Sequence, residues 1–127
     1  MSDEEPRRAI VHLIDDDLAV RESTEVLLQS AGIDVRTYAS AIDFLNEVNP
    51  KDIRFLIVDV NMPGINGIEL LDRLRSAGIT APAVFTTGRG DTADLREAAA
   101  RTGAGVLLKP YKFGELKDRI KRALYES

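Results

Sequence analysis

The sequence predicts an α/β domain, built around a doubly wound parallel sheet of five strands with five helices. Short apolar runs typical of buried strands alternate five times with longer segments whose apolar residues recur at helical spacing. In such an alternation each helix carries the chain back across the sheet, so successive strands run parallel through right-handed crossovers. The 127 residues lie within the range of one domain with one sizeable core.

The first two strand–helix pairs precede Pro50. Residues 10–14 form a continuous apolar run, and the helix after it is predicted to end at Gly32. The apolar stripe of that helix comprises Val20, Thr24, Leu27, Leu28 and Ala31. Residues 33–38 alternate as a half-exposed strand does, and Ser40 is suited to cap the next helix. The stripe of this second helix comprises Ala41, Phe44, Leu45 and Val48.

The third pair carries a clear helix start signal. Residues 55–58 are apolar throughout and predict a buried strand. Asn66 stands three residues before Glu69, the spacing of a capping box, and the helix is predicted to run to Ala77.

The last two pairs differ in the strength of their helices. Residues 83–86 and 105–110 predict the fourth and fifth strands. The helix between them, with Asp91 as its expected N-cap, is rich in Ala and has only Leu95 as a large apolar anchor, so we expect it to be the least stable helix. The final helix has a full stripe, formed by Phe113, Leu116, Ile120 and Leu124.

The composition excludes several kinds of site. There is no Cys, which excludes disulfides and thiolate metal ligands. The net charge of −4 argues against non-specific binding of nucleic acid, which needs a basic surface. No apolar run approaches the ~20 residues of a membrane span, and "MSDEEPRR" lacks the apolar core of a signal peptide, so we expect a cytoplasmic protein. Residues 1–7 are expected to form a charged tail and residues 8–127 a single domain.

Charged and hydroxyl side chains stand where four of the five predicted strands end. Asp15 and Asp16 follow the first strand, Asp59 the third and Thr87 the fourth, and Lys109 stands at the end of the fifth. Ligands of open doubly wound sheets bind outside the carboxyl ends of the strands, so these side chains should lie together. Two like charges ~4 Å apart repel by about 4 kcal/mol at an effective dielectric of about 20. Mg²⁺, a hard cation that prefers oxygen ligands, would neutralise them.

A site of this kind is suited to accept a phosphoryl group. A carboxylate can act as the nucleophile and form an acyl phosphate. Positioning, Mg²⁺ and an ammonium group supply most of the catalysis of phosphoryl transfer. Thr87 could donate its hydroxyl to a phosphoryl oxygen.

Four segments together resemble the receiver domain of two-component response regulators, the CheY-like superfamily. They are "IDDD", "IVDVNMPGINGIELL", "FTTG" and "LLKP". The resemblance covers the chain from about Arg8 to Tyr125, and the sequence of its motifs is most similar to receivers of the FixJ/NarL type. It implies a flavodoxin-like fold with the strand order 2-1-3-4-5.

The resemblance also implies a role for each residue of the site. Asp59 would accept the phosphoryl group, Thr87 would be the switch hydroxyl and Lys109 would bind the phosphoryl group. The implied Mg²⁺ ligands are Asp15, Asp16, Asp59 and the backbone carbonyl of Asn61. Thr87 is preferred to Thr86, which we expect to be a buried strand residue, because Gly88 follows it. The family often has a cis bond before the Pro after this Lys, here Pro110.

The implied function is signalling rather than turnover of a substrate. The donor would be a sensor histidine kinase or a phosphotransfer protein, and self-phosphorylation and autodephosphorylation would be the only reactions. The receiver of the signal would be a downstream protein or an output domain, and the resemblance is compatible with a phosphorylation-dependent homodimer. Direct contact with nucleic acid or a membrane is not expected.

Two alternatives depend on single residues. An aspartyl-phosphate phosphohydrolase would need a general acid two residues after the nucleophile, and Asn61 there cannot transfer a proton. A degenerate receiver that works as an unphosphorylated scaffold is suggested by Val106, because the family usually has an aromatic switch residue three positions before the Lys. Valine has neither a ring nor much rotamer freedom.

Two residues of the first predicted strand and the loop after it are interpreted as structural. His12, the only histidine, lies within an apolar strand, where a packed core residue is the commoner case. Asp17 is placed to cap the first helix.

Overall fold

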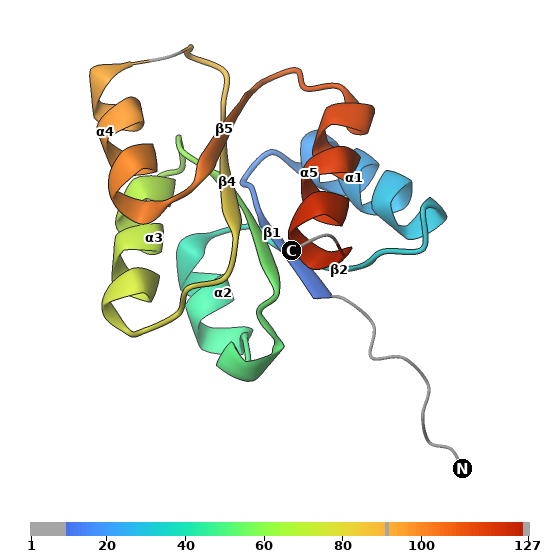
Figure 1. Ribbon diagram of the computed structural model, residues 1–127, viewed down its shortest axis with the longest axis horizontal. Coiled ribbons are helices and arrows are strands. Elements are labelled where there is room, and N and C mark those ends of the chain that lie inside the picture. Colours follow the sequence, from blue (N-terminus) through green and yellow to red (C-terminus); the bar gives the residue numbers. More distant parts are fainter. Residues whose placement is uncertain (1–9, 91, 126–127) are drawn as a thin grey trace.

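The computed structural model describes residues 10–90 and 92–125. The strands are β1 (Ile10–Ile14), β2 (Asp34–Tyr38), β3 (Phe55–Asp59), β4 (Ala83–Thr87) and β5 (Gly105–Leu108). The helices are α1 (Leu18–Ser30), α2 (Ala41–Glu47), α3 (Gly67–Ser76), α4 (Ala93–Thr102) and α5 (Phe113–Tyr125), with a 3-10 turn η1 at Pro50–Asp52. Strands and helices alternate as predicted (Figure 1).

All the strand pairs are parallel, and the strand order is β2-β1-β3-β4-β5, which confirms the predicted fold. The order reverses between β1 and β3, because the chain moves outward to β2 and then returns past β1. In the register of the sheet Ile14 pairs with Val58, and Asp59 pairs with Thr86. The residues after these strands therefore emerge side by side, at the switch point where doubly wound sheets bind ligands.

The sheet separates two apolar cores. Helices α2, α3 and α4 cover one face of the sheet, and α1 and α5 cover the other (Figure 1). Phe44, Leu70 and Phe85 are completely buried in the first core, and Leu28 and Leu116 in the second. Burial of a side chain of this size contributes about 1.5–3 kcal/mol, so the cores hold the strand ends in fixed positions.

Several predicted helix starts are confirmed at atomic detail. Ser40 accepts a hydrogen bond from the Asp43 backbone at 3.0 Å. Asn66 and Glu69 form the complete capping box. Asp17 accepts hydrogen bonds from the Ala19 and Val20 backbones and caps α1.

Other predictions needed correction. The sequence predicts Leu27 in the apolar stripe of the first helix, but 42% of this residue is exposed, because the part of the helix that faces the sheet is centred on Thr24 and Leu28. The fifth strand ends at Leu108, two residues earlier than predicted. Asp91 lies outside the described residues, and Thr92 is the N-cap of α4. The predicted tail at 1–7 also lies outside them.

Within the described ranges, none of the helices combines the length and the apolar character needed to cross a membrane.

Candidate functional site

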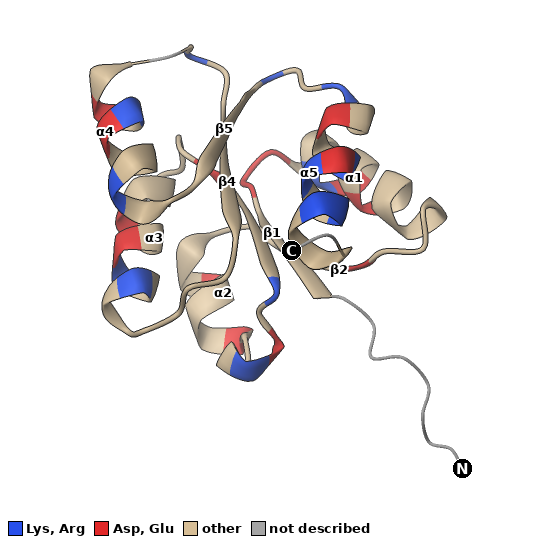
Figure 2. Cartoon of the chain, viewed as in Figure 1, with Lys and Arg blue, Asp and Glu red and all other residues tan. Residues whose placement is uncertain are grey.

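Asp15 begins the loop between β1 and α1 and is held there by two hydrogen bonds. Asp15 is completely buried, and its Oδ1 accepts a hydrogen bond from the Asp17 backbone at 2.8 Å. The guanidinium of Arg21 donates to the Asp15 backbone carbonyl at 2.7 Å. Figure 2 shows this loop as an acidic segment between β1 and α1. Asp17 caps the helix that follows, so the helix start and the position of Asp15 depend on one another.

Asp59 is the last residue of β3 and only 3% exposed. The Asn61 backbone donates a hydrogen bond to its Oδ1 at 3.1 Å. The first residue of α3, Gly67, lies so close that a Cβ there would overlap the Asp59 carbonyl oxygen and approach Val58 Cγ1 at 2.9 Å. The loop therefore closes tightly around the end of β3 and leaves the Asp59 carboxylate at the edge of the sheet.

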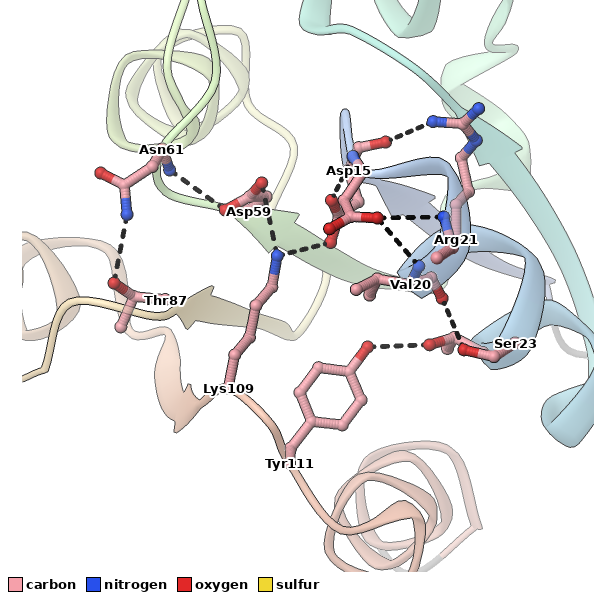
Figure 3. A network of polar contacts seen from close by, with 12 residues as sticks. Asp15, Val20, Arg21, Ser23, Asp59, Asn61, Thr87, Lys109 and Tyr111 are labelled. Carbon is pink, nitrogen blue, oxygen red and sulfur yellow. Dashed lines mark hydrogen bonds and ion pairs between the residues drawn. The ribbon is translucent and has the colours of Figure 1, made fainter.

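Lys109 joins the two buried carboxylates. Its Nζ lies 2.9 Å from Asp15 Oδ2 and 3.5 Å from Asp59 Oδ2 (Figure 3). The Lys109 backbone N–H donates to the Thr87 carbonyl at 2.7 Å, and the Lys109–Pro110 bond is cis, as predicted. Burial opposes the charge of the ammonium group, but the attraction of Asp15 and Asp59 outweighs it and raises the pKa of Lys109.

The carboxyl group of Asp59 is hard to ionise in this setting. Burial, and after it the repulsion from Asp15, raises the pKa of Asp59 to about 7, against the opposing attraction of Lys109. One ammonium group thus does not balance the two buried carboxylates. A further cation at this position would favour the ionised form that acts as a nucleophile.

Thr87 ends β4 beside the acidic cluster and is 2% exposed. Its Oγ1 accepts hydrogen bonds from Asn61 Nδ2 at 3.3 Å and from the Arg89 backbone at 3.1 Å. The hydroxyl keeps its own hydrogen for an acceptor. Thr86 is completely buried, as predicted.

The carboxylates fit a hard divalent cation. One oxygen from each of Asp15, Asp16 and Asp59 lies within 4.8 Å of the others. Asp15 Oδ2 is buried and has an ion pair with Lys109 but no hydrogen-bond partner among the described residues. Asp16 is exposed, so the cluster opens toward solvent. Oxygen ligands with one open side are the arrangement in which Mg²⁺ keeps waters and binds phosphate oxygens.

The predicted side chains meet at one edge of the sheet, and the structure adds three contacts that were not predicted. Asn61 was predicted for its backbone carbonyl, but the side chain contacts Thr87. Arg21 was not predicted, although a basic residue one turn into the helix after an acidic loop is a usable signal. Tyr111, two residues after Lys109, is hydrogen-bonded to Thr24, which no local pattern indicates.

Comparison with protein families identifies one match. The family described as the response regulator receiver domain matches residues 11–121. Among curated proteins, the transcriptional regulatory protein FixJ of Azorhizobium caulinodans is 38% identical over 122 residues, which are 96% of this chain and 58% of that protein. The response regulator protein TodT of Pseudomonas putida is 35% identical over 93% of this chain and 52% of its own length. The chain thus spans little more than half of these relatives.

Solved structures give the same result. The response regulator StyR has a TM-score of 0.81 and 37% identity over 93% of this chain and 60% of its own. A structure named FixJ-N has a TM-score of 0.79 and 32% identity over 92% of this chain and 94% of its own. The Vibrio cholerae chemotaxis protein CheY4 has a TM-score of 0.84 and 27% identity, covering 93% of this chain and 100% of that protein.

Proposed function

The chain belongs to the response regulator receiver domain family, and from that premise we propose that Asp59 accepts a phosphoryl group from a phosphohistidine. The donor is a sensor histidine kinase or a phosphotransfer protein. The observation that carries the proposal is the contact of one ammonium group, Lys109 Nζ, with both Asp15 and Asp59 at the switch point of the sheet.

In the transfer step, an Asp59 oxygen forms a bond to phosphorus while the bond from phosphorus to the histidine nitrogen breaks. The electron pair of the broken bond stays on the imidazole, and the product is an acyl phosphate. Lys109 balances the charge that gathers on the phosphoryl oxygens, and Thr87 donates its hydroxyl hydrogen to one of them. Both residues are held by strand-end hydrogen bonds and need little reorganisation.

Mg²⁺ is the proposed cofactor. Asp15, Asp16 and Asp59, with the backbone carbonyl of Asn61, would hold it, and the first three have the mutual distances that such a site requires. When bound, it supplies positive charge to the transferring oxygens and keeps Asp59 ionised. The buried side of the cluster excludes water, which strengthens these interactions.

The phosphohydrolase alternative is disfavoured by Asn61. This residue occupies the position where a general acid would stand, and its side chain donates to Thr87. An amide is too weak an acid to protonate a leaving group.

The partners follow from the relatives. The curated relatives named above are regulatory proteins of about twice the length of the matched region. We propose that phosphorylation of Asp59 changes the binding of this domain to an output domain or a separate protein, or to a second copy of the chain. The cytoplasmic location, and the lack of direct contact with nucleic acid or a membrane, stay predictions from the sequence.

The test is intact-protein mass spectrometry after incubation with acetyl phosphate and Mg²⁺. We expect the wild type to gain the mass of one phosphoryl group, and Asp59→Asn to gain none. Asp17→Asn is the matched control, because it also removes one carboxylate, from the neighbouring loop between β1 and α1, and keeps a side chain that can cap α1. Labelling of Asp59→Asn, or no labelling of the wild type, would contradict the proposal.

A further inference from the structure

Two hydroxyl groups meet in a groove beside the site. The Oγ1 of Thr24, in the middle of α1, and the phenol oxygen of Tyr111 are 2.9 Å apart. The groove has a volume of about 430 Å³, and its lining includes Val20, Thr24, Leu27, Lys109, Tyr111 and Phe113. The lining of the groove is largely apolar, so packing alone does not require a hydroxyl pair there. The pair is a polar connection between α1 and the segment before α5.

The same short segment carries the phosphoryl-binding group. Lys109 and Tyr111 are two residues apart and both line the groove. Lys109 points from the segment toward Asp59 and Asp15, and Tyr111 points toward α1 (Figure 3). The backbone N–H of Lys109 is fixed to Thr87 at 2.7 Å, so this segment is in contact with three parts of the site at once.

The charge of the site reaches Tyr111. Burial raises the pKa of the Tyr111 phenol and the hydrogen bond to Thr24 lowers it, while the charges of Asp15, Lys109 and Asp59 also act on the same group. A phosphoryl group carries about −1.5 to −2 charges and three strong acceptor oxygens. It would therefore draw Lys109 Nζ away from Asp15, and it would change the field at the phenol.

The position of the usual aromatic switch offers no comparable device in this chain. Val106 is half-buried and packs against the core on the α4 side of the sheet. The Val106 side chain has no polar atom that could form or break a hydrogen bond when Thr87 moves. Tyr111 has one, and it lies on the opposite face of the sheet, against α1 and α5.

We propose that the Thr24–Tyr111 hydroxyl pair transmits the phosphorylation state of Asp59 to α1 and to the groove between α1 and α5. The inference rests on the proposed function, because it needs Asp59 to accept a phosphoryl group. In the unphosphorylated chain the pair ties α1 to the Lys109–Tyr111 segment. When Lys109 turns toward the phosphoryl group, the tie loosens and the middle of α1 opens more readily.

The variants remove the hydroxyl groups and keep the shapes. Tyr111→Phe keeps the ring in the groove, and Thr24→Val replaces the hydroxyl by a methyl group. The double variant is the main one, because it leaves neither partner as an unpaired buried hydroxyl. Tyr125→Phe is the matched control, since it is the same chemical change at an exposed position near the end of α5.

The experiment measures amide hydrogen exchange in α1 before and after labelling with acetyl phosphate and Mg²⁺, with phosphate content determined by mass on the same samples. We expect labelling to speed the exchange of amides around Thr24 by about fivefold, the factor that one hydrogen bond of ordinary net strength gives. Tyr125→Phe should respond as the wild type does. The double variant should label as completely, with exchange that no longer depends on labelling. A purely structural role would shift both states of the variant equally and leave that dependence in place.

Three results would overturn the inference, and they separate its failure from that of the proposed function. If the wild type is labelled and its α1 exchange is unchanged, or if the double variant responds as the wild type does, the inference fails and the proposed function stands. If Asp59 takes up no phosphate at all, the proposed function fails and the inference falls with it.

Discussion

Asp59 and His12 are both buried ionisable groups, yet their surroundings assign them opposite tasks. Asp59 lies beside Asp15 and Lys109. A bound cation or a phosphoryl group would change the ion pairs among these three side chains. His12 is 2% exposed and hydrogen-bonded on both ring nitrogens, to the Tyr38 hydroxyl at 2.9 Å and the Asp52 carbonyl at 3.4 Å. Its interpretation as a packed core residue is confirmed. Both ring nitrogens of His12 already have partners, so a ligand has no free nitrogen to bind, whereas the Asp59 carboxylate can still bind a cation.

We predict that His12 titrates below its ordinary pKa of 6.5. Burial disfavours the imidazolium and lowers the pKa of His12, with a smaller contribution from Arg36, while the Asp52 carbonyl and the charges of Asp52 and Asp34 oppose it. A lowered pKa in the folded state means that His12 contributes its full share of stability above pH 6.5. That share is lost as the pH falls through the folded pKa.

The measurement is simple because the chain has one histidine. Its imidazole signal can be followed by proton NMR in an untagged protein, with the urea-unfolded chain as the reference for the ordinary value. A midpoint at or above 6.5 in the folded protein would show that the charged form is not disfavoured by burial.

At this scale, residues at strand ends could be predicted and contacts between distant segments could not. Asp15, Asp59, Thr87 and Lys109 each stand beside a recognisable apolar run, and parallel strands bring such positions to one edge. The side-chain contact of Asn61 with Thr87 joins residues 26 positions apart. It depends on loop geometry that no local spacing contains.

Among the elements, α3 starts where there is no room for a side chain. A Cβ on Gly67 would overlap the backbone carbonyl of Asp59, which cannot rotate away. We predict that Gly67→Ala lowers the free energy of unfolding by about 1–3 kcal/mol, the usual cost of overpacking. It should also slow the labelling of Asp59, because the end of β3 must shift. Urea unfolding and mass spectrometry measure the two effects.

Gly114→Ala is the control for this prediction. Gly114 is also near the start of a helix, but a Cβ there would meet no atom within 4 Å. Alanine in a compatible helical position stabilises by about 0.4–1 kcal/mol. Equal losses for the two variants would mean that the close approach at Gly67 is not the cause.

Helix α4 is fixed at its C-terminal end by two arginines of different burial. Arg75 of α3 is half-buried, and it donates to the carbonyls of Thr102 and Ile79, both at 2.9 Å. Arg101 forms an exposed pair with Asp72 at 2.9 Å. The prediction that α4 is the least stable helix stays a prediction, and these contacts anchor its last turn to α3.

We predict that Arg75→Ala destabilises the chain by about 1.5–3 kcal/mol, because it leaves two carbonyl groups without their charged donor. Arg101→Ala should cost less than about 1 kcal/mol, since exposed pairs contribute little. Urea unfolding ranks the two, and amide exchange should show faster opening at the C-terminal turn of α4 in Arg75→Ala alone. A larger loss for Arg101→Ala would reverse this assignment.

The periodicity of apolar residues predicted which segments are helices and which are strands. It did not predict a short turn or the exposure of a single residue. The turn at Pro50–Asp52 was not predicted, because three residues are too few to show a period. Leu27 was misplaced because the apolar stripe of α1 is wider than the part of it that the sheet covers.

For the whole molecule, the parallel sheet followed from the alternation of strands and helices, whereas the strand order came from the family resemblance. Alternation alone fixes the direction of the strands and the hand of the crossovers. It does not fix the point at which the order reverses, which here lies between β1 and β3. That reversal is what gathers the acidic loop, the end of β3 and Lys109 into one site.

Because the carboxylates of the cluster come from the ends of β1 and β3, a cation bound there should stabilise the whole chain. We predict that Mg²⁺ raises the melting temperature, since a ligand that binds only the folded state adds about 2.7 kcal/mol at one hundred times its dissociation constant. For a chain of 127 residues, in which 1 kcal/mol shifts the melting temperature by about 4 °C, that corresponds to a rise of about 10 °C. Thermal unfolding with and without MgCl₂, at ionic strength matched with NaCl, measures the effect and removes general charge screening.

The matched pair Asp16→Asn and Asp17→Asn tests where the cation binds. Asp16 is exposed and belongs to the carboxylate cluster, so its replacement should weaken the response to Mg²⁺ and leave the packing intact. Asp17 carries the same charge one residue later but is used as the cap of α1, a task that Asn also performs, so this variant should respond as the wild type does. If Mg²⁺ raised the melting temperature of both variants by the same amount as that of the wild type, the cation would bind at another site. In that case Lys109 alone, among residues 10–90 and 92–125, would balance the carboxylates of Asp15 and Asp59.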